Sequence, residues 1–360
     1  MSASAPPSAM DVKPARTPER EDFYQRLRTR DSSPLWEVLA EVVPPHPKPR
    51  VVPHIWKYDV MRPMLMEAGK LITAKEAERR VLILENPGLP EGTFTITQSL
   101  YAGLQLVLPG EVAPTHRHAP SALRFVMESS GGYTAVDGER TIMRPGDFIV
   151  TPSFTWHDHG NPENSSGPVI WMDVLDLALV NFLDSGYAQH HPQETQPLTH
   201  PDGDAYLRYG ANMFPVDYKP ERTSTPVFSY PYSRSREVLD RMFKNNPLHP
   251  CHGVKMRFVN PANGGPPLPA IQTFIQLLPK GFKGERHRFT DSTIFCCVEG
   301  RGRAHIGGTT IVWKQNDIFI APSWMPVAHE SDVDAVLFSA SDRPVQQMLG
   351  VWREEVPYIG

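Results

Sequence analysis

The feature that most constrains this chain is an internal repeat in which a pattern of histidines occurs complete once and broken once. The first copy holds His116-Arg-His118 and, further on, His157-Asp-His159. The second copy follows 171 positions later, as shown by four matched pairs: Gln105 and Gln276, Gly110 and Gly281, His116 and His287, and Gly131 and Gly302. A segment that recurs once at this spacing predicts two domains of the same architecture.

The second copy has lost two of these four histidines. Phe289 stands at the place of His118 and, after the deletion of one residue, Val327 stands at the place of His157. His116 is kept as His287, and His159 is kept as His329. A copy that keeps its turns and hydrophobic pattern while losing these side chains indicates one active site per chain, in the first copy.

The composition excludes several classes of function. A formal net charge of −4 offers no basic face for nucleic acid, and no apolar run approaches the roughly 20 residues of a membrane span. The start of the sequence shows no secretory signal. The chain has three cysteines, two of them adjacent, and this number and spacing do not suit a disulfide framework. We therefore expect a cytoplasmic protein without a nucleic-acid or membrane partner.

Patterning along the 360 residues predicts an all-β core with helical additions. From residue 93 the apolar period is two, and the short runs are separated by Pro-Gly, Gly-Gly and Asp-Gly turns, which is typical of an antiparallel barrel or sandwich. The expected regions are a disordered tail (1–20), an N-terminal helical region (21–88), a first barrel with the metal site (89–180), a linker (181–250), a second barrel without a metal site (251–342), and a C-terminal helix and tail (343–360).

Helical spacing of apolar residues marks five segments: 34–42, 64–70, 73–84, 233–245 and 344–355. The third of these opens with Thr73 and Glu76, which form a capping-box pattern.

The paired histidines predict a metal site. Residues i and i+2 of a strand project from one face, so His116 and His118 can converge on one ion, and His157 and His159 repeat that geometry. Neutral imidazoles with vacant coordination positions suit Fe(II), Mn(II), Ni(II), Cu(II) or Zn(II), and spacing does not choose among them. Such an ion keeps its full charge, which favours an anionic chelating substrate.

Two arginines are candidates for binding that anion. Arg124 shares the parity of His116 and His118 and lies in an apolar run, where an unpaired guanidinium would be costly. Its alternative is a structural ion pair with Glu128 or Glu139. Arg80 ends the third expected helix, where spacing alone favours a solvated side chain.

The run from Tyr101 to Phe125, with Trp156-His157-Asp-His159-Gly-Asn161, resembles the gentisate 1,2-dioxygenase family. These are bicupin ring-cleaving enzymes, with two double-stranded β-helix jelly-roll barrels, and their relatives include salicylate and 1-hydroxy-2-naphthoate dioxygenases. Residues 66–82 also resemble the N-terminal region of the family. Cupins commonly carry a glutamate shortly after the second histidine, where this chain has Ala122 and Leu123, and that absence matches a site of three histidines.

The resemblance implies one Fe(II) per chain, held by His116, His118 and His157. It implies substrate contacts from Arg80, Gln105, Arg124 and His159, a pocket shaped by Tyr101 and Gly103, and catalytic roles for His159 and Arg124. His159 would relay a proton or steady oxygen, although its retention as His329 supports a purely structural role. The implied reaction inserts O2 between the carboxyl-bearing and hydroxyl-bearing carbons of a 2-hydroxybenzoate and converts gentisate to maleylpyruvate. Family elements that pack between subunits imply a homotetramer.

The sequence also allows other substrates and other classes of cupin. Within the family the substrate could be salicylate, a halo- or nitro-substituted salicylate or 1-hydroxy-2-naphthoate, and Tyr101 favours gentisate. Outside it, the chain could be a non-redox metal-binding cupin, either an isomerase or hydrolase or a ligand-binding protein. Consumption of O2 would distinguish these classes.

Overall fold

The computed structural model describes residues 16–211 and 213–357, and the chain divides after Lys48 into an N-terminal arm and a larger body. The arm contains α1 (Pro18–Arg28) and α2 (Leu35–Val42). Thr17 caps α1 by accepting a hydrogen bond from the amide of Arg20. No residue of α2 is buried, and Leu35 and Val42 are 54% and 62% exposed. Of the expected tail, residues 1–15 lie outside the described residues, and 18–20 belong to α1.

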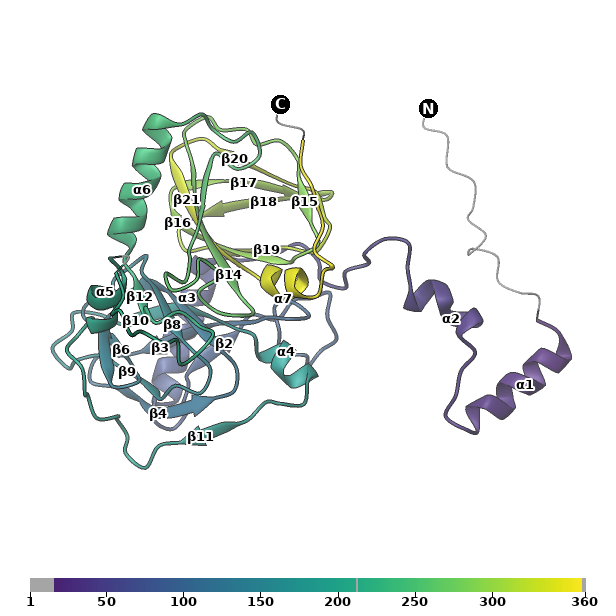
Figure 1. Cartoon of the computed structure of the whole chain (residues 1–360), viewed down its shortest axis with the longest axis horizontal. Coiled ribbons are helices and arrows are strands. Elements are labelled where there is room, and N and C mark those ends of the chain that lie inside the picture. The colour runs from purple at the N-terminus through teal and green to yellow at the C-terminus, as the bar shows by residue number, and fades with distance from the viewer. Residues whose placement is uncertain (1–15, 212, 358–360) are drawn as a thin grey trace. The chain divides into compact units, whose positions relative to one another are not determined.

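The body is built from two β-barrels (Figure 1). The strands of the first are β2 (Val81–Ile83), β3 (Tyr101–Val107), β4 (Val112–His118), β5 (Ala122–Glu128), β6 (Tyr133–Val136), β7 (Glu139–Ile142), β8 (Phe148–Thr151), β9 (His157–Gly160), β10 (Val169–Leu175), β11 (Ala188–His190) and β12 (Ser229–Tyr230). They form a six-stranded sheet in the order β12-β8-β5-β10-β3-β2 and a five-stranded sheet in the order β11-β4-β9-β6-β7. All the pairings are antiparallel, as the alternating pattern predicts.

The second barrel contains β1 (His54–Trp56), β13 (Val254–Arg257), β14 (Gln272–Leu278), β15 (Arg288–Phe289), β16 (Thr293–Glu299), β17 (Arg301–Ile306), β18 (Thr309–Lys314), β19 (Ile318–Ala321), β20 (Val327–Ser331), β21 (Ala335–Ser341) and β22 (Glu354–Glu355). Its larger sheet has the order β1-β19-β16-β21-β14-β13, beside a sheet β18-β17-β20 and the pair β15-β22.

The repeat in the sequence is a repeat in the structure. β3 and β14 begin and end 171 positions apart, and so do β5 and β16. β8 and β19 are 170 positions apart, which places the single deletion between β16 and β19. The prediction of two barrels of one architecture is confirmed.

In the described part of the body, five helices accompany the barrels: α3 (Tyr58–Leu71), α4 (Leu177–Phe182), α5 (Asp204–Tyr209), α6 (Tyr232–Asn245) and α7 (Arg343–Met348). The helices expected at 34–42, 64–70 and 233–245 are confirmed in α2, α3 and α6. The C-terminal helix is shorter than expected, because α7 ends at Met348 and the chain then forms β22. Within the described ranges, no helix is both long and apolar enough to cross a bilayer.

The helix expected at 73–84 is wrong. Its capping box does form, since the Thr73 amide donates to Glu76 Oε2 and the Glu76 amide donates to Thr73 Oγ1, at 3.0 and 3.1 Å. Glu78 then adopts a left-handed backbone conformation, with φ of 54°, which ends the turn. The chain continues into β2, which pairs with β3, so the region expected to be helical supplies an edge strand of the first barrel.

Strands from the expected N-terminal region and from the expected linker also belong to the barrels. β1, from the N-terminal region, pairs with β19 of the second barrel. β11 and β12, from the expected linker, pair with β4 and β8 of the first barrel.

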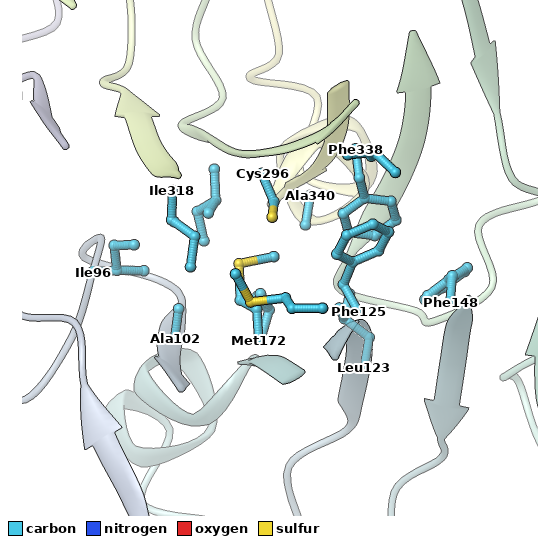
Figure 2. Packing of buried hydrophobic residues seen from close by; sticks show 14 of the residues in the cluster. Ile96, Ala102, Leu123, Phe125, Phe148, Met172, Cys296, Ile318, Phe338 and Ala340 are labelled. Atoms are coloured by element: carbon cyan, nitrogen blue, oxygen red, sulfur yellow. The ribbon is translucent and has the colours of Figure 1, made fainter. Parts of the chain in front are cut away.

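The two barrels share one hydrophobic core (Figure 2). Phe125 of the first barrel stacks on Phe338 of the second with ring centroids 4.4 Å apart, and both are buried. Burial of one such side chain stabilises the fold by about 1.5–3 kcal/mol. Because side chains alternate along a strand, Phe125 faces this core while its neighbour Arg124 faces the interior of the first barrel.

Candidate metal centre and acid-binding pocket

Three histidines converge inside the first barrel. Nitrogen atoms of His116, His118 and His157 lie within 4.8 Å of one another, and the ring centroids are 4.5 to 5.1 Å apart. His116 and His118 come from β4 and His157 from the adjacent β9, where His116 and His157 are direct cross-strand partners. The structure therefore brings together the three residues predicted as metal ligands.

Backbone carbonyls orient two of these rings. His118 Nδ1 lies 2.7 Å from the Pro120 carbonyl oxygen, and His157 Nδ1 lies 3.0 Å from that of Thr155. Protons on these Nδ1 atoms leave the Nε2 lone pairs free for a metal. Burial, reinforced by nearby positive charges, lowers the pKa of His116 to about 2, and burial lowers that of His118 to about 4. The rings are therefore neutral at pH 7, as metal binding requires.

The spacing of the nitrogens fits a divalent transition metal. His116 Nε2 and His157 Nε2 are 2.9 Å apart. Two imidazole nitrogens bound at about 2.1 Å and at right angles to each other would be about 3 Å apart. Among the described residues the cluster contains histidines alone, with no carboxylate. A metal held there would keep its charge and several open positions.

A cavity of about 410 Å³ opens in front of the three histidines. Its volume is within the range that small organic ligands occupy. Its lining comes from β2, β3, β4, β5, β9 and β10 and from the segment around α4 and β11: Arg79, Val81, Tyr101, Gln105, His116, His118, Pro120, Ala122, Arg124, His157, Asp173, Leu175, Leu177, Asn181, Gly186, Tyr187 and Ala188. The pocket therefore combines a metal centre, two guanidinium groups and an apolar wall.

Arg124 lies in this lining, as predicted. Its side chain is 3% exposed, and Nε lies 3.5 Å from Oδ1 of Asp173, its cross-strand partner on β10. Nη1 also donates to Thr151 Oγ1. The ion-pair partner is thus Asp173, and neither Glu128 nor Glu139, which were the alternatives. Burial raises the pKa of Asp173, and the charge of Arg124 opposes that shift.

Arg79 lines the pocket, whereas Arg80 does not. The guanidinium of Arg80 is buried against Glu111 and donates to the Ile72 carbonyl at 2.8 Å. Arg79 shares the parity of Val81 and donates to the Pro114 carbonyl at 2.9 Å. The substrate contact expected from Arg80 is therefore not supported. If residues 79–83 are treated as a strand, Arg79 and Val81 face the same side, and Arg79 is then predicted to line the pocket.

Tyr101 and Gln105 line the cavity from β3, and Gly103 lies between them. A Cβ at Gly103 would lie 2.4 Å from Val81 Cγ1 and 3.0 Å from the Tyr101 hydroxyl oxygen. The missing side chain thus lets these two neighbours close together, which agrees with the expected shaping role. Gln105 Nε2 is buried and has no hydrogen-bond partner among the described residues.

His159 lies behind the pocket wall. It is fully buried, its Nδ1 is 3.0 Å from Thr134 Oγ1, and its ring packs on Trp171 with centroids 5.0 Å apart. It does not belong to the cavity lining, and its Nε2 has no partner among the described residues. Trp171 and Thr134, rather than the cavity, therefore surround the His159 ring.

Sequence reasoning missed several lining residues besides Arg79. Asp173 alternates with the core residues Met172 and Val174 on β10, and that parity was available in the sequence. Asn181 and Tyr187 come from the segment after β10, and no periodicity predicts that this segment folds over the pocket.

The corresponding end of the second barrel has no such cluster among the described residues. His287 is next to Phe289, and its amide donates to the carbonyl of Val327. Phe289 and Val327 thus lie beside His287 at the places of two of the three first-barrel histidines.

Two fused jelly-roll barrels, one of which holds three inward-facing histidines, define a bicupin metalloprotein. The comparisons agree: a family model described as a cupin domain matches residues 103–175. Gentisate 1,2 dioxygenase 1 of Aquipseudomonas alcaligenes is 56% identical over 95% of this chain and 98% of its own length. 5-Aminosalicylate 1,2-dioxygenase of Comamonas sp is 34% identical over 92% of this chain and 89% of its own.

A solved structure extends the match to the whole fold. Salicylate 1,2-dioxygenase from Pseudoaminobacter salicylatoxidans, in an adduct with gentisate, superimposes with a TM-score of 0.89 at 29% identity over 98% of this chain and 97% of that one. The chain belongs to the gentisate 1,2-dioxygenase family of ring-cleaving dioxygenases.

Proposed function

We propose that this protein is a gentisate 1,2-dioxygenase, which inserts O2 between the carboxyl-bearing and hydroxyl-bearing ring carbons and yields maleylpyruvate. The observation that carries the proposal is the three-histidine cluster in the wall of a cavity that also holds Arg79 and Arg124. The 56% identity to a gentisate dioxygenase supports gentisate over the other 2-hydroxybenzoates.

We propose Fe(II) as the metal, one per chain, held by His116, His118 and His157. When bound, it supplies the redox chemistry for reaction with O2 and lowers the pKa of the substrate hydroxyl. Three neutral imidazoles without a carboxylate suit this role, because an ion held by them would keep its charge and several open positions.

The arginines bind and orient the substrate in this proposal. A carboxylate is bound most firmly by a planar guanidinium that is already fixed in place. Arg124 is fixed by Asp173 and Thr151, and Arg79 by backbone carbonyls. Gln105 Nε2 is free to donate a hydrogen bond, and Tyr101 and Gly103 set the width of the site. Holding the ring in a reactive orientation is the main contribution of these side chains.

For His159 we propose a proton relay or a stabilising role behind the metal site, acting through its unpartnered Nε2. Replacement by asparagine keeps a hydrogen bond to Thr134 but removes proton transfer. A changed pH profile of kcat in His159→Asn, at unchanged iron content, would support the relay. An unchanged profile would leave His159 as a packing residue.

Oxygen uptake tests the reaction. The iron-loaded protein should consume O2 with gentisate and form a ring-opened absorbing product. Ranking gentisate, salicylate, halo- and nitrosalicylates and 1-hydroxy-2-naphthoate by kcat/KM decides the substrate. Absence of O2 consumption with every acid would favour a non-redox cupin.

We further propose a homotetramer in the cytoplasm. The apolar side chains exposed on α2 support burial against another subunit. Three buried cysteines without a disulfide suit a reducing compartment. Light scattering during size exclusion measures the assembly, and cell fractionation measures the location.

A further inference from the structure

The second barrel keeps a small internal cavity at the position of the metal pocket in the first barrel. The cavity has a volume of about 20 Å³ and is lined by Lys255, His287, Phe289 and Asp291 among others. Lys255 pairs with Gln276 in the same register in which Val81 pairs with Gln105. Lys255 therefore enters the second barrel from the strand position that carries a pocket residue in the first.

Positive charge exceeds negative charge around this cavity. Lys255 Nζ lies 4.6 Å from the ring centroid of Phe274, and the guanidinium of Arg343 lies 5.1 Å from the same centroid. The nearby carboxylate is Asp291, whose Oδ1 lies 3.3 Å from Arg343 Nε and accepts a hydrogen bond from Trp352 Nε1 at 2.7 Å. Asp291 is therefore engaged by Arg343 and Trp352, and it forms no hydrogen bond with Lys255.

Lys255 itself has no hydrogen bond or salt bridge within the described part of the chain. Burial and the charge of Arg343 lower its pKa to about 7, while Asp291 opposes the shift. His249, His252 and His287 lie near Lys255, and burial lowers the pKa of each, so these rings are neutral and add no positive charge. A buried ammonium group without a partner is costly unless it loses its proton or gains an anion.

We infer that the second barrel is an anion site, in which Lys255 Nζ binds one small monovalent anion such as chloride. The cavity holds about one water-sized sphere, which excludes an aromatic acid. Phe289 and Val327 line this cavity at the places that His118 and His157 hold in the first barrel. The duplicated barrel thus has lost the metal but kept the preference for negative charge.

Two measurements on the iron-loaded full-length protein test this inference. Thermal unfolding in sodium chloride and in sodium gluconate at equal ionic strength should differ, with chloride raising Tm by roughly 2–4 °C. Anomalous diffraction from crystals soaked in sodium bromide should show one bromide beside Lys255 Nζ. Neither measurement depends on substrate turnover, so the site can fail while the proposed dioxygenase function stands.

Lys255→Met removes the charge while keeping the side-chain length, and it should abolish both the Tm shift and the bromide peak. Lys280→Met, at an exposed position near the same barrel, is the matched control and should keep both. If Lys255→Met does not fold, Lys255→Gln, which also removes the charge, takes its place with the same expected result. Wild-type crystals without bromide at Lys255, or an equal chloride effect in Lys255→Met, would overturn the anion site.

Discussion

At the scale of single residues, a few side chains decide which barrel can hold a metal. Both copies keep the first histidine, as His116 and His287, but Phe289 and Val327 stand where the first barrel has His118 and His157. This difference was readable from spacing alone, because the ligands lie on strands whose register the repeat preserves. A single remaining imidazole offers too few donors for a stable site.

His118→Ala should therefore remove both iron and activity, whereas His287→Ala should leave about one iron per chain. The reason is that only His118 belongs to the cluster of three nitrogens. Iron content by mass spectrometry, together with O2 uptake, checks both variants. Equal loss of iron from the two variants would contradict a single site in the first barrel.

The adjacent arginines give a second contrast between single residues. Arg79→Met should lower kcat/KM for gentisate by roughly 30- to 160-fold, because it removes a charge-assisted contact worth about 2–3 kcal/mol. Arg80→Met should instead destabilise the fold by about 3 kcal/mol or more, since it leaves Glu111 without its buried partner. Steady-state kinetics and thermal unfolding separate the two effects. A larger loss of kcat/KM per folded enzyme in Arg80→Met would reverse the assignment.

At the scale of elements, local signals predicted where the strands and most helices lie. They did not predict, for every segment, whether it forms a helix or a strand. The capping box of Thr73 and Glu76 forms as a local interaction, so it was predictable. Its continuation was not, because residues 81–83 gain a ladder with β3 that no local pattern reveals. The expected helix also hid that Arg79, and not Arg80, lines the cavity.

The contact between β7 and α5 predicts a pH dependence. Glu139 accepts a hydrogen bond from the Ala205 amide at 2.7 Å, and burial raises its pKa from 4.5 to about 7. The folded state thus retains a proton that the unfolded state has lost, so this contribution to stability declines as pH rises from about 4.5 through 7.

Glu139→Gln mimics the protonated carboxyl group and should remove that decline. Relative to wild type, the variant should gain about 1–2 kcal/mol between about pH 5 and pH 8, a value reduced for solvent screening. Thermal unfolding across this range measures the gain, and Glu85→Gln, at an exposed position, is the control. A constant difference between wild type and Glu139→Gln would mean that the carboxyl group is already ionised at pH 5.

At the scale of the whole molecule, the repeat predicted two barrels but not how they join. The shared core depends on which face of β5 and β16 is apolar, and both faces carry apolar residues, as in Leu123-Arg124-Phe125-Val126. No sequence pattern predicts the pairing of β1 with the second barrel either, because His54–Trp56 is three residues long and lies far along the chain from β19. Contacts of this kind depend on tertiary packing rather than on local preference.

The exposed apolar side chains of α2 allow a test of the proposed tetramer. Leu35 and Val42 are apolar and exposed, and a monomer gains nothing from presenting them to water. The double variant Leu35→Asp/Val42→Asp should therefore shift the proposed tetramer to smaller species, because burying two carboxylates in an interface costs several kcal/mol. Light scattering measures the mass, and Glu41→Gln in the same helix is the control. A tetramer that persists in the double variant would show that this face of α2 lies outside the subunit interface.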